Sequence, residues 1–151
     1  MKIYFDTCCL CRLDDSPTHA RIRLEAQAVE TILQRCLMKQ WFWFGSEVLA
    51  FEVKNIAIQS KLLQAQSRLN HIYQNVIVNK NEISRAKYLE SLGFKRMDAL
   101  HIACAESINV DVFLTTDDKL IRIAKRCSSE LSIHIDNPHE WLQEMNKNDR
   151  R

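Results

Sequence analysis

The chain has 151 residues, 46% hydrophobic and 26% charged, which is the balance of one soluble globular domain with a sizeable core. A formal net charge of +2 is too small to indicate a nucleic-acid partner by bulk electrostatics, so such a partner has to be argued from a local site. Gly45 and Gly93 are the only glycines, which excludes a dinucleotide-binding fingerprint and a Walker P-loop.

The sequence predicts neither a membrane segment nor a secretion signal. No apolar run approaches the ~20 residues of a membrane span, and the apolar residues 3–5 are far shorter than the core of a signal peptide. We therefore expect a cytoplasmic protein with no membrane partner. The six cysteines are then expected to be buried thiols, because disulfides are rare in the cytosol and the pair at 8 and 11 has no second pair to complete a zinc site.

Hydrophobic periodicity divides the chain into alternating strands and helices. Apolar residues spaced three and four apart predict helices, and short apolar runs rich in β-branched or aromatic residues predict strands. In the first half of the chain we expect a strand at 2–5, a loop at 14–17, a helix at 18–39, a strand at 41–44, a helix from 45 to 56 and a longer helix carrying Leu62, Leu63, Leu69 and Tyr73. In the second half we expect a strand at 75–78, a helix at 82–92 capped by Gly93, a helix at 95–108, a strand at 111–115, a helix at 117–127, a strand at 131–135 and a short amphipathic segment from Pro138.

This alternation predicts an α/β fold, a three-layer α/β/α sandwich with a mostly parallel central sheet. Right-handed crossovers would place helices on both faces of the sheet. Because the sequence has no linker or repeat, we expect one domain at residues 1–145 and a short polar tail at residues 146–151. Ligands of such folds bind beyond the carboxyl ends of the strands, so polar residues that directly follow strands are candidates for a site.

Four acidic residues are notable for their positions. Asp6 directly follows the first predicted strand and Asp117 follows the strand at 111–115, so both belong to the carboxyl edge of the sheet. Glu52 and Asp98 lie near the starts of apolar helices, where a charged side chain is rarely buried unless it is paired or bound to a metal. If the strands that precede Asp6 and Asp117 are neighbours, these two carboxylates would be close enough to share a cation.

Each of these acids also has a purely structural interpretation. Asp6 could cap a turn, Glu52 could lie on the exposed face of its helix, and Asp98 could interact with a helix dipole. Asp117 or Asp118 could be the N-cap of the helix that follows. Several carboxylates at one edge repel one another, however, and a cation would offset that repulsion. Oxygen ligands without a His or Cys cluster indicate Mg²⁺ or Mn²⁺, and such a site suits hydrolysis of phosphodiesters.

Four stretches together resemble a known family: MKIYFDT, SEVLAFEV, RMDALHIACAE and VFLTTDDKL. The resemblance spans roughly residues 1–142 and is to PIN-domain proteins, most of all to bacterial toxin ribonucleases of the VapC type. It implies a PIN-like fold, a Mg²⁺ or Mn²⁺ site and cleavage of RNA. Matched position by position, it implies that Asp6, Glu52, Asp98 and Asp117 are the catalytic and metal-binding residues.

The resemblance leaves two positions open and fails at a third. Glu47 competes with Glu52, because Ser46-Glu47 also opens that helix, and Asp118 competes with Asp117. The family usually has Asn or Ser two residues after the first Asp, whereas this chain has Cys8. A thiol is a poor hydrogen-bond partner, so the support of Asp6 is expected to differ.

Neighbouring residues have weaker assignments. Thr7 and Thr115 could support the carboxylates through their hydroxyl groups. His101 lies one turn beyond Asp98 and is expected to be a packing histidine of the core. Several basic residues could line an RNA channel or could be ordinary solvated surface: Arg12, Lys95, Arg96 and Lys119.

Two functions follow from these observations. The first is a Mg/Mn-dependent endoribonuclease, the toxin of a type II toxin–antitoxin pair; by family analogy its substrate is RNA, its partner is an antitoxin and it is a homodimer. The alternative is a PIN-fold RNA-binding or interaction module with weak or no cleavage, which Cys8 favours. Phosphoryl transfer is disfavoured for two reasons. Cys8 stands where an Asp-x-Asp phosphatase needs its second acid, and the strand at 75–78 is followed by Asn79-Lys80, where a response-regulator receiver needs a phospho-acceptor acid.

Overall fold

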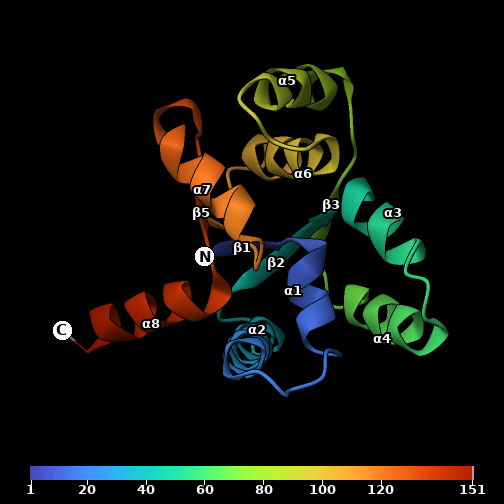
Figure 1. Cartoon of the computed structure of the whole chain (residues 1–151), viewed down its shortest axis with the longest axis vertical. Coiled ribbons are helices and arrows are strands. Elements are labelled where there is room, and N and C mark those ends of the chain that lie inside the picture. Colours follow the sequence, from blue (N-terminus) through green and yellow to red (C-terminus); the bar gives the residue numbers. More distant parts are fainter. Residues whose placement is uncertain (151) are drawn as a thin grey trace.

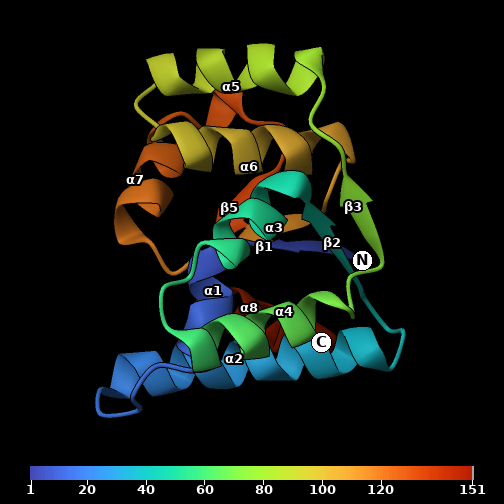
Figure 2. The same cartoon turned by 90° about the vertical axis from the view of Figure 1, so that its right-hand side faces the viewer.

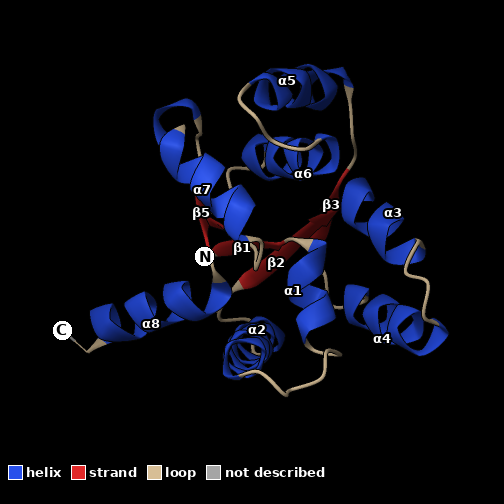
Figure 3. Cartoon of the chain, viewed as in Figure 1, coloured by secondary structure: helices blue, strands red, loops and turns tan. Residues whose placement is uncertain are grey.

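The centre of the molecule is the first strand, in which Ile3, Tyr4 and Phe5 are completely buried. It is β1 (Lys2–Phe5) of a computed structural model that describes residues 1–150. All strands pair in parallel, in the order β3-β2-β1-β4-β5, which confirms the predicted α/β fold. Figure 3 shows the strands in red, surrounded by the helices in blue. The other strands are β2 (Phe42–Ser46), β3 (Gln74–Val76), β4 (Val112–Leu114) and β5 (His134–Asp136).

Helices occupy most of the chain between the strands, and each predicted helix has a counterpart. They are α1 (Thr7–Arg12), α2 (Ala20–Leu37), α3 (Glu47–Lys54), α4 (Gln59–Leu69), α5 (Lys80–Ser91), α6 (Arg96–Ser107), α7 (Asp118–Arg126) and α8 (Pro138–Asp149). α1 was not expected, because its six residues are too few to show a helical period. The expectation that Tyr73 belongs to the longer helix is wrong, since α4 ends at Leu69 and Tyr73 lies in the segment before β3.

Side chains along β1 alternate between two cores, as a pleated strand requires. Ile3 and Phe5 join a core built with residues of α1, α2, α3, α4 and α8, whereas Tyr4 joins a core built with α5, α6 and α7. Figures 1 and 2 show α5, α6 and α7 on one face of the sheet and α1, α2, α4 and α8 on the other. The three-layer arrangement predicted from the sequence is therefore present.

The order of the strands creates a switch point beside Asp6. The chain runs from β1 outward to β2 and β3, and then returns to β4 on the other side of β1. Phe5 is in register with Leu114, and the Asp6 backbone N–H donates to the Leu114 carbonyl at 2.9 Å. Ligands of open parallel sheets bind where the strand order reverses in this way. The condition that Asp6 and Asp117 follow neighbouring strands is thus met.

The C-terminal helix α8 packs against α2, and the ring of its Trp141 lies 5.3 Å from that of Trp41 between centroids. The helix continues to Asp149, so much of the segment expected to be a polar tail (146–151) is helical, and residue 151 lies outside the described residues. In the part of the chain that the structure describes, no helix has the length and apolar character needed to cross a membrane.

Candidate metal centre at the carboxyl edge of the sheet

Asp6 is held in place by donors on both of its carboxylate oxygens. It ends β1, is 6% exposed and serves as the N-cap of α1, with Oδ1 accepting from the Thr7 N–H at 2.8 Å. Oδ2 accepts from the Thr115 hydroxyl at 3.0 Å and from the Cys8 thiol at 3.4 Å. Asp6 therefore caps a helix and also lies at the candidate site. The hydrogen bonds to both oxygens fix the orientation of its carboxylate.

Glu52 on α3 comes to the same place from a different element. Its Oε1 accepts from the Thr7 hydroxyl at 2.7 Å and contacts Nε2 of His101. Burial by itself would raise the pKa of Glu52, but hydrogen bonding and the charge of His101, with the bond from Thr7, hold that pKa below its usual value. Its competitor Glu47 is exposed and accepts from the Val78 N–H at 2.8 Å instead.

His101 on α6 is a member of this cluster that the sequence analysis assigned only to packing. It is completely buried, as expected, but its Nε2 faces Glu52 and lies 3.8 Å from Oδ1 of Asp6. One donor atom each from Asp6, Glu52 and His101 lies within 4.8 Å of the other two, a spacing that could hold a metal ion. The signal was available, because residues three apart on a helix share a face and His101 follows Asp98 by three.

Asp98, in the first turn of α6, is half-buried and stands next to this group without belonging to it. Burial, and after it the negative charges of Asp6 and Asp117, together raise the pKa of its carboxyl to about 6, although the charge of His101 lowers it. Asp6 and Asp117 contribute to this shift through the repulsion between like charges. This is the electrostatic situation that a bound cation would relieve.

Asp117 is the N-cap of α7, which confirms one of its structural interpretations. Its Oδ1 accepts from the backbone N–H groups of Lys119 at 2.9 Å and Leu120 at 3.2 Å. The Asp117 N–H in turn donates to the Thr115 hydroxyl at 3.1 Å, and the same hydroxyl donates to Asp6. Thr115 therefore ties the turn that carries Asp117 to the carboxylate at the end of β1.

Asp118, the competitor of Asp117, is engaged elsewhere. Its two carboxylate oxygens accept from the two terminal nitrogens of Arg21, both at 2.6 Å. This bidentate bond lowers the pKa of Asp118. Arg21 also donates to the carbonyl of Thr116 at 3.3 Å, so it links α2 to the turn between β4 and α7.

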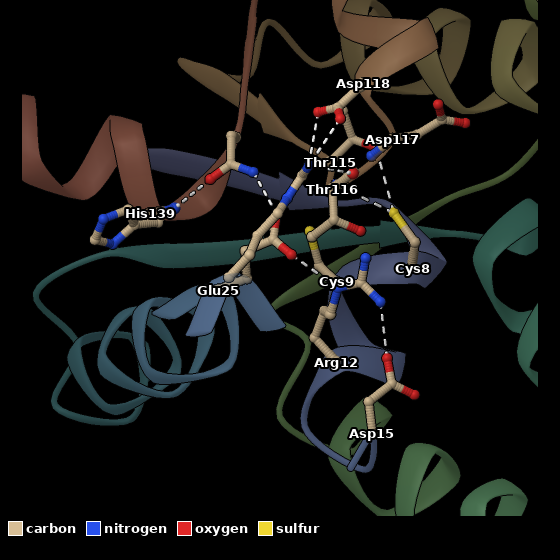
Figure 4. A network of polar contacts seen from close by, with 12 residues as sticks. Cys8, Cys9, Arg12, Asp15, Glu25, Thr115, Thr116, Asp117, Asp118 and His139 are labelled. Carbon is tan, nitrogen blue, oxygen red and sulfur yellow. Dashed lines mark hydrogen bonds and ion pairs between the residues drawn. The ribbon is translucent and has the colours of Figure 1, made fainter. Parts of the chain in front are cut away.

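A buried carboxylate, that of Glu25, lies in the polar network around this turn (Figure 4). Glu25 on α2 is 1% exposed and accepts from Arg12 Nε at 2.9 Å, Asn137 Nδ2 at 2.6 Å and Arg21 Nε at 3.3 Å. It thus joins α1, the start of α8 and, through Arg21, the β4–α7 turn. The sequence analysis did not identify this residue, since a single Glu in an amphipathic helix carries no local sign of burial.

Cys8 occupies the position where the family prefers a polar side chain. Besides its contact with Asp6, its sulfur lies 3.3 Å from the Thr115 hydroxyl and accepts from the Thr116 N–H at 3.3 Å. All six cysteines are free; Cys9, Cys104 and Cys127 are buried as expected, whereas Cys8, Cys11 and Cys36 are only partly buried. The thiol thus makes the contacts of a polar group at the longer distances that sulfur requires.

The basic residues near the site divide into two kinds. Arg12 is bound to Asp15 at 2.8 Å and to Glu25, so it is committed to the protein. Lys95, Arg96 and Lys119 are exposed. Exposure leaves these three compatible both with an RNA channel and with solvated surface.

The sequence was compared with known proteins. No protein-family model matches it, and no curated protein does. Solved structures match over about the whole chain: FitAcB from Neisseria gonorrhoeae (TM-score 0.60, 14% identity, 90% of this chain and 97% of that chain) and VapBC-1 from nontypeable Haemophilus influenzae (0.60, 13%, 91% and 98%).

A third match is VapBC2 from Rickettsia felis bound to a DNA fragment from their promoter, with a TM-score of 0.53 and 16% identity over 91% of this chain and 98% of that chain. Identities this low support the fold and nothing finer. The order of the strands, the helices on both faces and these matches agree with the family resemblance read from the sequence. The chain therefore has the same fold as these structures.

Proposed function

We propose that the protein is a Mg²⁺- or Mn²⁺-dependent endoribonuclease and the toxin of a type II toxin–antitoxin pair. The observation that carries the proposal is the meeting of Asp6 and Glu52, from two distant parts of a PIN fold, with their donor atoms within 4.8 Å of each other and of a buried imidazole. Carboxylates gathered at a strand switch point are suited to bind a cation and a phosphate together.

The residues present fit a hard divalent cation. Asp6, Glu52, Asp98 and Asp117 would supply the oxygen ligands that Mg²⁺ and Mn²⁺ prefer. The pKa of Asp98, raised to about 6 by burial and by neighbouring carboxylates, supports this assignment. When bound, such an ion lowers the pKa of a water molecule and neutralises charge on the phosphate in an in-line displacement.

The protein itself contributes orientation. Thr7 donates to Asp6 through its N–H and to Glu52 through its hydroxyl, and Thr115 donates to the other oxygen of Asp6. These bonds fix the carboxylates before any ligand arrives, which reduces the reorganisation needed on binding. Exposed Lys95, Arg96 and Lys119 would attract the RNA backbone by charge.

The experiment that tests the proposal is single-turnover cleavage of an RNA pool with Mg²⁺, Mn²⁺ or EDTA. We expect cleavage with either ion, none with EDTA, and at least about a hundredfold slower cleavage by Asp6→Asn. Cleavage that survives EDTA or Asp6→Asn would contradict it.

The expected partners and location extend the proposal. As a toxin the chain would act in the cytosol, form a homodimer and be silenced by an antitoxin encoded next to it. VapBC2 of Rickettsia felis is described as bound to a fragment of promoter DNA, and the analogous complex would be expected here. Light scattering of the purified chain, alone and with the product of the neighbouring reading frame, measures both associations.

A binding module with weak or no cleavage is the second candidate, and Cys8 is the observation that favours it. The thiol lies 3.4 Å from Oδ2 of Asp6, in a place where the family usually has Asn or Ser. A Mn²⁺ binding isotherm for wild type, Asp6→Asn and Asp98→Asn separates the two functions. The binding module would be favoured if the chain cleaves no RNA and if neither substitution changes its affinity for Mn²⁺ or for RNA.

A further inference from the structure

The buried histidine of the candidate metal centre has an arrangement that packing does not explain. His101 is completely buried and is the one nitrogen donor in the group that it forms with Asp6 and Glu52. Its Nε2 points to these two carboxylates, while its Nδ1 points the opposite way into the protein. A histidine that only fills space would not need to present a ring nitrogen to two acids.

The far side of the ring is held by a buried chain of hydroxyl groups. Nδ1 of His101 lies 2.5 Å from the hydroxyl of Tyr4, which lies 2.6 Å from the hydroxyl of Ser46. Ser46 also accepts from the Leu49 N–H at 3.2 Å, so the chain ends on the backbone of α3. Tyr4 and Ser46 are both completely buried. The ring is therefore fixed in orientation by residues of β1 and β2.

This chain of hydroxyls permits the tautomer that a ligand needs. A metal-binding histidine offers one ring nitrogen to the ion and donates from the other to a fixed partner. A tyrosine or serine hydroxyl can donate or accept, so Tyr4 can accept from Nδ1–H while donating to Ser46. Nε2 is then free to offer its lone pair to a cation held between the imidazole and the carboxylates of Asp6 and Glu52.

We propose that Nε2 of His101 is a metal ligand, with Asp6 and Glu52, and that it gives this site a preference for first-row transition ions over Mg²⁺. Imidazole suits transition ions, whereas Mg²⁺ is held through oxygen ligands and water. This inference rests on the proposed function, because it concerns the ion of the same site. It adds a ligand that the acidic residues alone do not provide.

The experiment is electron spin resonance of the wild-type chain with Mn²⁺ alone as the probe. Electron spin echo envelope modulation detects a nitrogen nucleus bound directly to Mn²⁺. We expect ¹⁴N modulation in wild type, its replacement by ¹⁵N modulation when only the histidines are ¹⁵N-labelled, and its loss in His101→Gln. The affinity of that variant for Mn²⁺, from titration of the free-ion signal, should fall at least about tenfold, with a smaller change for Mg²⁺.

A second variant tests the orientation of the ring. Tyr4→Phe keeps the aromatic ring, which stacks on Phe113 with centroids 5.2 Å apart, and removes the hydroxyl that holds Nδ1. We expect weaker Mn²⁺ binding with the ¹⁴N modulation retained. Circular dichroism of both variants establishes that they fold, and the wild-type spectrum is decisive even if a variant does not.

The outcomes separate this inference from the proposed function. Mn²⁺ that binds without nitrogen modulation would overturn the histidine ligand and leave the carboxylate site standing. Equal losses of Mn²⁺ and Mg²⁺ affinity in His101→Gln would overturn the stated preference. Absence of any Mn²⁺ binding by wild type would overturn both the ligand and the metal-dependent function.

Discussion

At the scale of single residues, Asp98 links the candidate site to stability. Burial and the charges of Asp6 and Asp117 raise its pKa from 3.8 to about 6. The folded chain therefore binds more protons than the unfolded chain between these two values, so the free energy of unfolding falls as pH rises through this window and stays lower above it. In the absence of metal, the ionised Asp98 destabilises the fold at neutral pH.

Asp98→Asn is accordingly predicted to raise stability while removing a metal ligand. Thermal unfolding in EDTA should give a higher Tm for the variant than for wild type at about pH 7.5, and a smaller difference at about pH 4, where the wild-type carboxyl is protonated. The variant should also bind Mn²⁺ more weakly. A variant whose Tm is lower than wild type at the higher pH would contradict the electrostatic account.

Glu52 and Glu47 form a matched pair for a second prediction, since both lie on α3 and the sequence left their roles open. Glu52→Gln should reduce metal-dependent RNA cleavage at least about a hundredfold, because Glu52 is the one that meets Thr7 and His101. Glu47→Gln should leave cleavage within about threefold, since Glu47 is exposed and accepts from the Val78 N–H away from Thr7 and His101. Single-turnover rates decide it, and a reversed order of the two variants would move the site to Glu47.

At the scale of elements, Glu25 is the contact that joins α1, α2 and the start of α8. Two arginines and an amide converge on a carboxylate that is 1% exposed. Removing one partner of a buried ionic network leaves the others without compensation, which destabilises more than losing an exposed ion pair.

Glu25→Ala is predicted to reduce the free energy of unfolding by about 2 kcal/mol, below the usual range for buried pairs because Arg21 is half exposed and can be rehydrated. Glu30→Ala, an exposed position on the same helix, is the control and should change it by less than about 0.5 kcal/mol. Urea denaturation of both variants measures the difference. Equal effects would mean that helix propensity, and not the network, was being measured.

At the scale of the whole molecule, the candidate site ties the two cores together. Asp6 follows β1, Glu52 belongs to α3 in the first core, and His101 belongs to α6 in the second. An ion held by all three would bridge elements that are far apart in the sequence. Binding would then stabilise the fold as a unit and not one helix alone.

Mn²⁺ at about a hundred times its Kd is therefore predicted to stabilise the chain by about 2.7 kcal/mol, which raises Tm by roughly 5–10 °C for a domain of this size. Differential scanning fluorimetry in EDTA and in Mn²⁺ measures this shift. Asp6→Asn should lose most of it, and a shift that Asp6→Asn retains in full would place the bound ion elsewhere.

The sequence by itself determined the alternation of strands and helices and the edge of the sheet at which the acids lie. Hydrophobic periodicity is local, so it located β1, β4 and the helices between them within a few residues. Because parallel strands end at one edge, Asp6 and Asp117 were assigned to the same side before their distance was known. The resemblance of four short motifs added the fold, which the structural matches bear out.

Only the tertiary structure decided which side chains meet. Glu52 and Glu47 are both glutamates on the same helix, and their different surroundings depend on how α3 packs against α1, β2 and α6. The burial of Glu25, the orientation of the His101 ring and the position of β4 beside β1 also depend on contacts between elements distant in sequence. Such contacts are set by the packing of whole faces, whereas the pattern along a chain reports only which face each residue occupies.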